Sequence, residues 1–210
     1  MTDDDDTLPQ PKSAPEDRAF SGPFDVSEAN AVRPYVDLGG VKIVPREGLG
    51  LRLEVEEGTG RVVAVGLDIA ESSLQIQPFA APRSSGLWHE IRDQIQQQIL
   101  SQGGSTRVVD GPFGPELLAQ IPAQASPGAP PVSRIARFVG VDGPRWFLRG
   151  VISGEGAVNA EAAAQVEELF RSVVVVRGTG PMPPRDLIPL QMPQGAEEEA
   201  QGPDRTQLQA

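Results

Sequence analysis

Arginine and phenylalanine side chains recur along two stretches of this sequence at a spacing that could bind an anionic ligand. The stretches, 134–142 and 145–153, flank Gly143-Pro144 and are typical of a hairpin with a two-residue loop, in which Asp142 lies opposite Arg145. In this register one face carries the candidate binding residues Arg134, Phe138, Arg145, Phe147 and Arg149. Guanidinium groups contact phosphates and aromatic rings stack on bases, so this face is a candidate for binding single-stranded nucleic acid.

The opposite face of the same hairpin is apolar, which indicates the side that packs on the protein core. It carries Ile135, Val139, Val141, Trp146, Leu148 and Ile152, interrupted by Arg137. Two structural alternatives stay open for the Arg/Phe face. Helices could cover it and bury Phe138 and Phe147, or its arginines could pair with acidic residues of a neighbouring strand.

Residues for catalysis or metal binding are few. His89 is the only histidine and there is no cysteine, so a Ser-His-Asp site would have to use His89, and no G-x-S-x-G motif supplies its nucleophile. Gly154-Glu155-Gly156 precedes a predicted helix, but it lacks the third glycine of a dinucleotide fingerprint and the lysine of a P-loop. We therefore expect no metal and no cofactor. A hydrolase that uses His89 or a carboxylate pair is the last of the hypotheses.

The elements that position these residues begin with an alternating pattern. Segments 49–55, 63–69 and a third that starts at Leu74 carry apolar residues with a period of two. Their short connections predict an antiparallel meander, preceded by a short strand at 41–44. Pro78 is expected to end the third strand or to place it on an edge.

Two helices are predicted, at 87–101 and 160–172. The first has one apolar stripe and a possible cap in the pair Ser84-Ser85, and the second begins after the capping residue Asn159. Further strands are predicted at 106–110, 115–121 and 173–176. Runs of strands followed by a helix, twice, indicate a single α+β domain at 21–190, with a mostly antiparallel sheet of six to eight strands.

Acidic residues are concentrated in the two terminal segments. The chain of 210 residues has a net charge of −11, of which residues 1–20 carry −4 and residues 191–210 carry −3. Both segments are polar, and we expect them to be disordered acidic tails.

No apolar run approaches the roughly 20 residues that span a bilayer, so we expect a cytoplasmic protein without membrane contact. The apolar, Pro-rich segment 181–193 is expected to lie as an extended strap on the domain, or else to dock on a partner.

Several motifs along the chain resemble those of one protein family. They are GPFDVSEA (22–29), YVDLGGVKIVP (35–45), GLWHEIRDQI (86–95), GPRWFLRGVISG (143–154) and LFRSVVVVRG (169–178). In these motifs the sequence is similar to an actinobacterial family of uncharacterised proteins, the DUF3710 family. The resemblance implies no activity and no catalytic residues. The strand–WFLRG–strand–helix ending also resembles the Mog1/PsbP-like architecture, which concerns the fold alone.

Together these observations favour a non-enzymatic interaction or adaptor module that binds a protein partner. The alternative is a nucleic-acid-associated protein that holds single strands on the Arg/Phe face. Because residues 21–190 are mildly acidic, with a net charge of −4, attraction of the whole domain to nucleic acid is disfavoured, whereas a local basic patch stays open. The sequence carries no signal of an oligomeric state.

Overall fold

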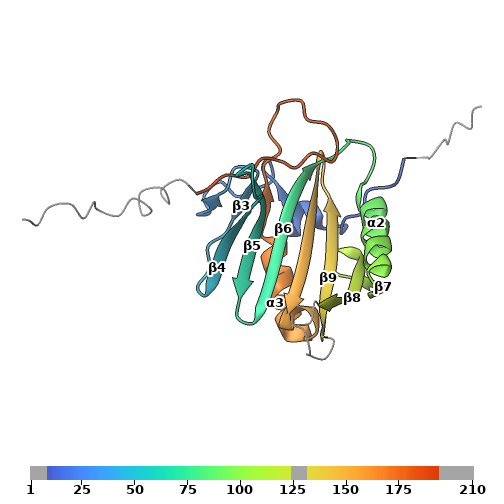
Figure 1. Cartoon of the computed structure of the whole chain (residues 1–210). Coiled ribbons are helices and arrows are strands. Elements are labelled where there is room, and N and C mark those ends of the chain that lie inside the picture. The colour runs from blue at the N-terminus through green and yellow to red at the C-terminus, as the bar shows by residue number, and fades with distance from the viewer. Residues whose placement is uncertain (1–8, 124–131, 194–210) are drawn as a thin grey trace, which may run out of the picture.

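The fold is built around one large antiparallel sheet. The computed structural model describes residues 9–123 and 132–193, which form an α+β fold. The strands of the large sheet are β4 (Leu49–Val55), β5 (Val62–Ile69), β6 (Ser72–Ala80), β7 (Ser105–Gly111), β8 (Gly114–Ala123), β9 (Val132–Asp142) and β10 (Trp146–Gly154). They lie in the order β4-β5-β6-β10-β9-β8-β7 (Figure 1). All neighbouring strands run antiparallel, which confirms the prediction from the alternating pattern.

A second, smaller sheet packs against the first. Its strands are β1 (Phe24–Asp25), β2 (Val36–Asp37), β3 (Val41–Ile43) and β11 (Val174–Val175). They lie in the order β1-β11-β3-β2, with β1 and β11 parallel. From the sequence we expect one sheet of six to eight strands, whereas the described residues divide eleven strands between two sheets. The strands predicted at 41–44 and 173–176 correspond to β3 and β11. The two-residue strands β1 and β2 are too short to show an alternating pattern, so the sequence does not reveal that these four strands form a second sheet.

Three helices and a 3-10 turn complete the described residues. They are α1 (Arg18–Ser21), α2 (Trp88–Ser101), η1 (Glu155–Ala157) and α3 (Ala160–Arg171). The predictions of α2 and α3 are confirmed. Asn159 caps α3, because its side chain accepts hydrogen bonds from the backbone N–H groups of Glu161 (2.9 Å) and Ala162 (3.2 Å).

The two faces of the large sheet are covered by different elements. On the first, which we call the α3 face, Val139, Leu148 and Ile152 pack in the main core with Phe170 of α3 and with the small sheet. On the second, the α2 face, α2 packs over β7, β8 and β9. In Figure 1, α3 lies behind the sheet and α2 stands at the right beside these strands. Neighbouring side chains of a strand therefore lie on different faces and have different packing partners, because side chains alternate along a strand.

Pro78 lies inside β6 rather than at its end. The strand continues to Ala80 along β10, whereas its pairing with β5 stops at Ile76. Beyond that point the segment 181–193, the strap, takes the place of β5, and Ile188 N–H donates to the carbonyl of Pro78 (2.9 Å). The missing N–H of Pro78 thus falls on the side where β6 changes its pairing partner. The strap crosses the upper end of the sheet in Figure 1.

The strap is fixed by two apolar side chains that belong to the main core. Ile188 is 2% exposed and Leu190 is 7% exposed. Replacing Ile188 with aspartate is expected to lower the free energy of unfolding by about 3 kcal/mol, because it removes a buried side chain and places a carboxylate there. Urea denaturation followed by circular dichroism measures this loss. The control is Met192→Asp, at a position 55% exposed, which should change stability by less than about 0.5 kcal/mol. Equal losses would contradict a core role of the strap.

Helix α2 receives its N-terminal cap from another element, so the expectation of a cap in the pair Ser84-Ser85 is wrong. No side chain of the residue before the helix caps it. The backbone N–H groups of Leu87 and Trp88 instead donate to the carboxylate of Asp142 in β9, at 2.8 and 3.4 Å. A carboxylate at this end also interacts favourably with the helix dipole. Because Asp142 follows Trp88 by 54 positions, no local pattern reveals this cap.

The hairpin of β9 and β10 has a different register from the predicted one. Asp142 lies opposite Phe147, not opposite Arg145. A backbone hydrogen bond from Gly143 N–H to the carbonyl of Trp146 (2.7 Å) closes the loop. The two registers differ by two residues, and a shift of two leaves every side chain on its original face. The predicted division into a core face and an Arg/Phe face therefore persists.

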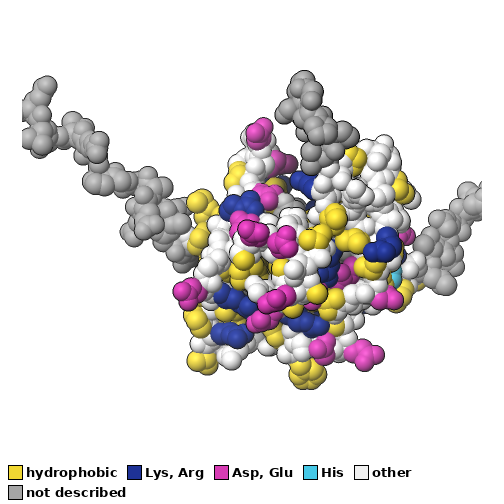
Figure 2. All heavy atoms as spheres, turned by 90° about the horizontal axis from the view of Figure 1, so that it is seen from below, with side chains coloured by type: hydrophobic (Ala, Val, Ile, Leu, Met, Phe, Trp, Pro, Cys, Tyr) yellow, Lys and Arg dark blue, Asp and Glu magenta, His cyan; other side chains and the backbone are white. Residues whose placement is uncertain are grey.

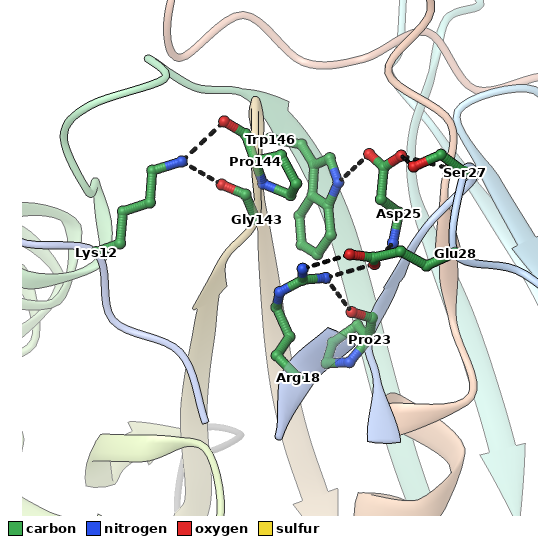
Figure 3. A network of polar contacts seen from close by, with 9 residues as sticks. All are labelled: Lys12, Arg18, Pro23, Asp25, Ser27, Glu28, Gly143, Pro144 and Trp146. Atoms are coloured by element: carbon green, nitrogen blue, oxygen red, sulfur yellow. Dashed lines mark hydrogen bonds and ion pairs between the residues drawn. The ribbon is translucent and has the colours of Figure 1, made fainter. Parts of the chain in front are cut away.

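Residues 9–20, assigned from the sequence to the acidic N-terminal tail, lie against the turn of this hairpin. Lys12 Nζ donates to both carbonyls of the Gly143-Pro144 turn, at 2.5 and 2.8 Å (Figure 3). The guanidinium of Arg18 lies 5.6 Å from the centroid of the Trp146 ring, a cation–π contact. Each of these contacts joins one side chain of the N-terminal segment to a residue far along the chain. The polar composition of residues 1–20, which predicts a disordered tail, therefore does not reveal them. Residues 191–193, assigned from the sequence to the C-terminal tail, belong to the strap, where Gln191 N–H donates to the carbonyl of Leu38 (2.9 Å). Residues 1–8 and 194–210 of the predicted tails lie outside the described residues.

Candidate binding groove

Helix α2 leaves part of the α2 face uncovered. It covers the β7–β9 side, and a groove of about 420 Å³ lies over the remaining part of this face. Its polar lining comes from β4, β6, β9 and β10, and consists of Arg52, Glu54, Ser73, Gln75, Arg134, Arg149 and Ser153. Its apolar lining consists of Ile121, Ala136, Phe138 and Val151. These residues together are called the groove below.

The strand pattern explains why polar side chains gather here. Ser73, Gln75 and Gln77 alternate along β6 with Leu74 and Ile76, which are fully buried on the α3 face. Because side chains alternate along a strand, the neighbours of a core residue point to the opposite face. The α2 face is thus apolar where α2 packs on it and polar where it is uncovered.

The charges at the β4 side of the groove are paired within the sheet. Arg52 donates from Nε and Nη2 to the carboxylate of Asp68, at 2.5 and 3.0 Å, and from Nη2 to Ser73 Oγ at 3.3 Å. The hydrogen bonds from Arg52 hold the pKa of Asp68 below its ordinary value. Glu54 accepts a hydrogen bond of 2.5 Å from Gln75 Nε2. This side of the groove therefore has no unsatisfied cation.

Arg149 in β10 differs from Arg52. Its Nη2 donates to Gln77 Oε1, and its buried Nε has no hydrogen-bond partner among the described residues. Burial lowers the pKa of Arg149, and no described carboxylate lies near enough to oppose this effect. Residues 124–131, which join β8 to β9, contain no aspartate or glutamate. Arg149 is therefore a cation taken largely out of water without an anionic partner on the described part of the chain.

The structure brings three of the five predicted binding residues together. Arg134, Phe138 and Arg149 all line the groove, and Arg134 is exposed. Arg145 lies in the hairpin loop at the other end of the strands, where its carbonyl accepts a hydrogen bond from Ala81 N–H (3.0 Å). The predicted set is therefore split, because Arg145 lies at the turn of the hairpin whereas Arg134 lies near the start of β9.

Phe147 is also outside the groove, because α2 covers it. Its side chain is fully buried, and its ring stacks on Trp88 of α2 (centroids 6.0 Å apart) and on Phe79 of β6 (6.1 Å). Of the alternatives left open by the sequence, a helix over this face therefore holds for Phe147. A ring enclosed on both sides cannot stack on a nucleotide base, so Phe138 is the aromatic residue of the predicted set that remains in the groove.

The second alternative, pairing of the arginines of the Arg/Phe face with acidic residues, is not observed, because Arg134, Arg145 and Arg149 form no ion pair within 9–123 and 132–193. Arg137 on the α3 face does have acidic partners. Arg137 donates to Glu116 of β8 (2.8 Å) and to Glu167 of α3 (2.7 Å). Glu116 is 1% exposed, so this arginine joins a buried carboxylate to the helix. The charge that interrupts the predicted core face is thus compensated by two partners from other elements.

Several groove residues escaped the sequence analysis. They are Arg52, Glu54, Ser73, Gln75 and Ser153. The signal existed within each strand, since each of these residues is adjacent to a residue of the core face. The alternation of side chains along a strand does not show which strands are neighbours in the sheet. Strand β6 pairs with β10, although α2, β7, β8 and β9 separate the two strands in the sequence.

Other candidates for chemistry are placed as follows. His89 is half-buried in the first turn of α2. In Gly154-Glu155-Gly156, Glu155 N–H donates to the carbonyl of Glu71 (3.0 Å) and Gly156 N–H donates to Ser72 Oγ (2.9 Å), so these backbone N–H groups already have acceptors within the fold.

Within 9–123 and 132–193, no group of three or more His, Asp or Glu side chains is placed to hold a metal ion. None of the described helices has the length and apolar character to cross a membrane.

Comparison with known proteins covers nearly all of the elements described above. A family model described as "Protein of unknown function (DUF3710)" matches residues 22–199. No curated protein matches the chain. The matched range contains both sheets, α2, α3, the strap and every residue of the groove. The chain therefore belongs to the DUF3710 family, as the motifs in its sequence indicate.

Proposed function

We propose that this protein is a non-enzymatic interaction module that binds an acidic segment of a partner protein in the groove. The observation that carries the proposal is Arg149, a largely buried cation in the part of a sheet face that α2 leaves uncovered, without an anionic partner among the described residues. A bound segment would cover this part of the face, as α2 covers the rest. The volume of the groove, about 420 Å³, is in the range of ligand sites in proteins.

Charge complementarity supports an acidic occupant. Of the three arginines that line the groove, Arg52 is paired with Asp68, which leaves Arg134 and Arg149 against the single carboxylate of Glu54, whereas the chain as a whole carries a net charge of −11. On the face seen from below, acidic and basic side chains are intermixed over the described surface (Figure 2). The groove is therefore a local site of positive potential on an acidic protein, which suits a specific anionic segment better than a long polyanion.

Nucleic acid is the second candidate, and one observation favours it. Arg134, Phe138 and Arg149 share the groove, as the predicted Arg/Phe face requires. Binding of a single strand would depend steeply on salt, because each neutralised phosphate releases counterions. Docking of a short acidic segment with one or two charges would depend on salt much less. Affinity measured at two salt concentrations therefore separates the two candidates.

Site-specific crosslinking tests the proposed interaction. A photoreactive residue is placed at Ser153, in the groove, and for comparison at Glu161, exposed on α3. We expect a partner protein that is captured from cells at Ser153 and not at Glu161, and whose purified form binds the purified chain. Replacing Ser153 with tryptophan should then weaken the affinity by tenfold or more, a cost of about 1.4 kcal/mol, because the indole fills the groove.

The matched control is Glu161→Trp, which should leave the affinity unchanged. A partner that binds the Ser153→Trp chain as tightly as the original would refute the groove as the docking site. A complex that is lost on nuclease treatment would instead favour the nucleic-acid candidate.

A further inference from the structure

We propose that Arg149 binds an oxyanion of the docked ligand, a carboxylate or a phosphate group, and that the groove accommodates one such group. This inference rests on the proposed function and names the chemistry by which the groove selects its ligand.

The guanidinium of Arg149 is held in place but not satisfied. Gln77 accepts from its Nη2 and itself donates from Nε2 to the carbonyl of Val63 (2.9 Å), so the acceptor that orients Arg149 is fixed. The Nε–H group of Arg149 is buried and has no acceptor among the described residues. A guanidinium has five N–H donors in a planar fork that matches the two oxygens of a carboxylate or phosphate group. An oxyanion would supply the acceptors that are missing.

Other arginines of the same sheet show what Arg149 lacks. Arg52 is paired with Asp68, and Arg137 is paired with Glu116 and Glu167. Both of these cations have a carboxylate partner within the fold. A cation removed from water without such a partner lowers stability. In a groove, a residue of this kind is a candidate for binding an anionic ligand.

The charges of the groove indicate a single anionic group. Arg134 and Arg149 come from the adjacent strands β9 and β10, and Arg134 adds a second positive charge at the exposed part of the lining. Glu54 lies at the β4 side and would repel another anion there. We therefore expect one oxyanion on the β9–β10 side of the groove and no second one near β4.

Thermal unfolding of the unliganded protein provides the first test. Replacing Arg149 with methionine keeps an unbranched apolar side chain, although a shorter one, and removes the unpaired charge, so the melting temperature should rise by about 2–4 °C. An arginine with a purely structural role would lower it when replaced. The matched variant Arg52→Met breaks the pair with Asp68 and should not raise the melting temperature.

Titration of the full chain with small anions provides the second test. The probes are sodium acetate and inorganic phosphate, each compared with sodium chloride at the same ionic strength, and the signals are the arginine Nε–Hε resonances in ¹⁵N-correlated NMR spectra. We expect a saturable shift of the Arg149 resonance with at least one probe and little change for Arg52. The probe that binds more tightly identifies the source of the oxyanion. No saturable shift of Arg149 with either probe, or a lower melting temperature of Arg149→Met, would overturn the inference.

The inference and the proposed function fail in different ways. If Ser153→Trp abolishes binding of the partner and Arg149→Met leaves it unchanged, the groove is the docking site and the oxyanion contact is refuted. If Ser153→Trp leaves binding unchanged, the groove is not the docking site. Loss of binding in both variants, with the control Glu161→Trp unaffected, supports both.

Discussion

Replacing Asp142 with alanine is expected to lower the free energy of unfolding by about 3 kcal/mol. The carboxylate is buried and accepts backbone N–H groups of Leu87 (2.8 Å), Ser13 (3.0 Å) and Trp88 (3.4 Å). It thus joins the start of α2 and the N-terminal segment to the end of β9. Alanine leaves these donors unsatisfied, and each buried donor without an acceptor costs about 1–3 kcal/mol, of which relaxation of α2 recovers a part. Urea denaturation followed by far-UV circular dichroism measures the loss.

The control for this variant is Asp93→Ala. Asp93 is an exposed residue of α2 that pairs with the adjacent Arg92 (3.3 Å), and exposed pairs contribute at most about 1 kcal/mol. A second readout is tryptophan fluorescence, because the side chain of Trp88 is buried between α2 and the sheet. If Asp142→Ala and Asp93→Ala lose the same stability and Trp88 stays buried in both, Asp142 is not the residue that holds α2 in place.

The stability conferred by Asp142 should also depend on pH. Burial raises the pKa of Asp142 above the ordinary 3.8, although hydrogen bonds from Leu87, Ser13 and Trp88 offset part of the rise. Between pH 3.8 and the pKa of the folded state, the folded protein holds a proton that the unfolded chain has released. The free energy of unfolding therefore falls as the pH rises through that window. The difference in stability between the original chain and Asp142→Asn should shrink over the same window, and a constant difference would contradict the raised pKa.

Replacing Arg137 with methionine is expected to lower the free energy of unfolding by about 3–4 kcal/mol. Arg137 donates to Glu116 and Glu167, and Glu116 is 1% exposed, so the substitution leaves a buried carboxylate without its cation. Breaking a buried ion pair by removing one partner costs about 3–5 kcal/mol, because the other charge stays uncompensated. Arg134→Met in the same strand is the control, since Arg134 is exposed, and it should cost less than about 0.5 kcal/mol.

A double variant separates loss of packing from the uncompensated charge. Adding Glu116→Gln to Arg137→Met removes the buried carboxylate, and we expect it to restore about 1 kcal/mol or more of the lost stability. Glu116→Gln in the original chain should instead be destabilising, because the pair with Arg137 is lost. If the double variant is no more stable than Arg137→Met, the cost comes from lost packing and not from Glu116.

Local patterns in the sequence determined most of the elements. Period-two alternation located β4, β5 and β6, and the stripe of isoleucines located α2. The face of the β9–β10 hairpin to which each side chain points was also predictable, even though the loop was placed one residue too early. Alternation has a period of two in any strand, so the division into faces does not depend on the exact pairing.

Tertiary structure alone decided how these elements meet. In the folded protein α2 covers Phe147 and leaves Arg149 at the edge of an uncovered area of the sheet. The N-terminal cap of α2 comes from Asp142 of β9. The acidic partners of Arg137 come from β8 and α3. Each of these contacts joins residues that are distant along the chain. Backbone propensity and side-chain periodicity act over a few residues, whereas neighbours in a sheet depend on the total burial of apolar surface. The groove is the consequence of where α2 stops covering the sheet, and no segment of the sequence specifies that boundary by itself.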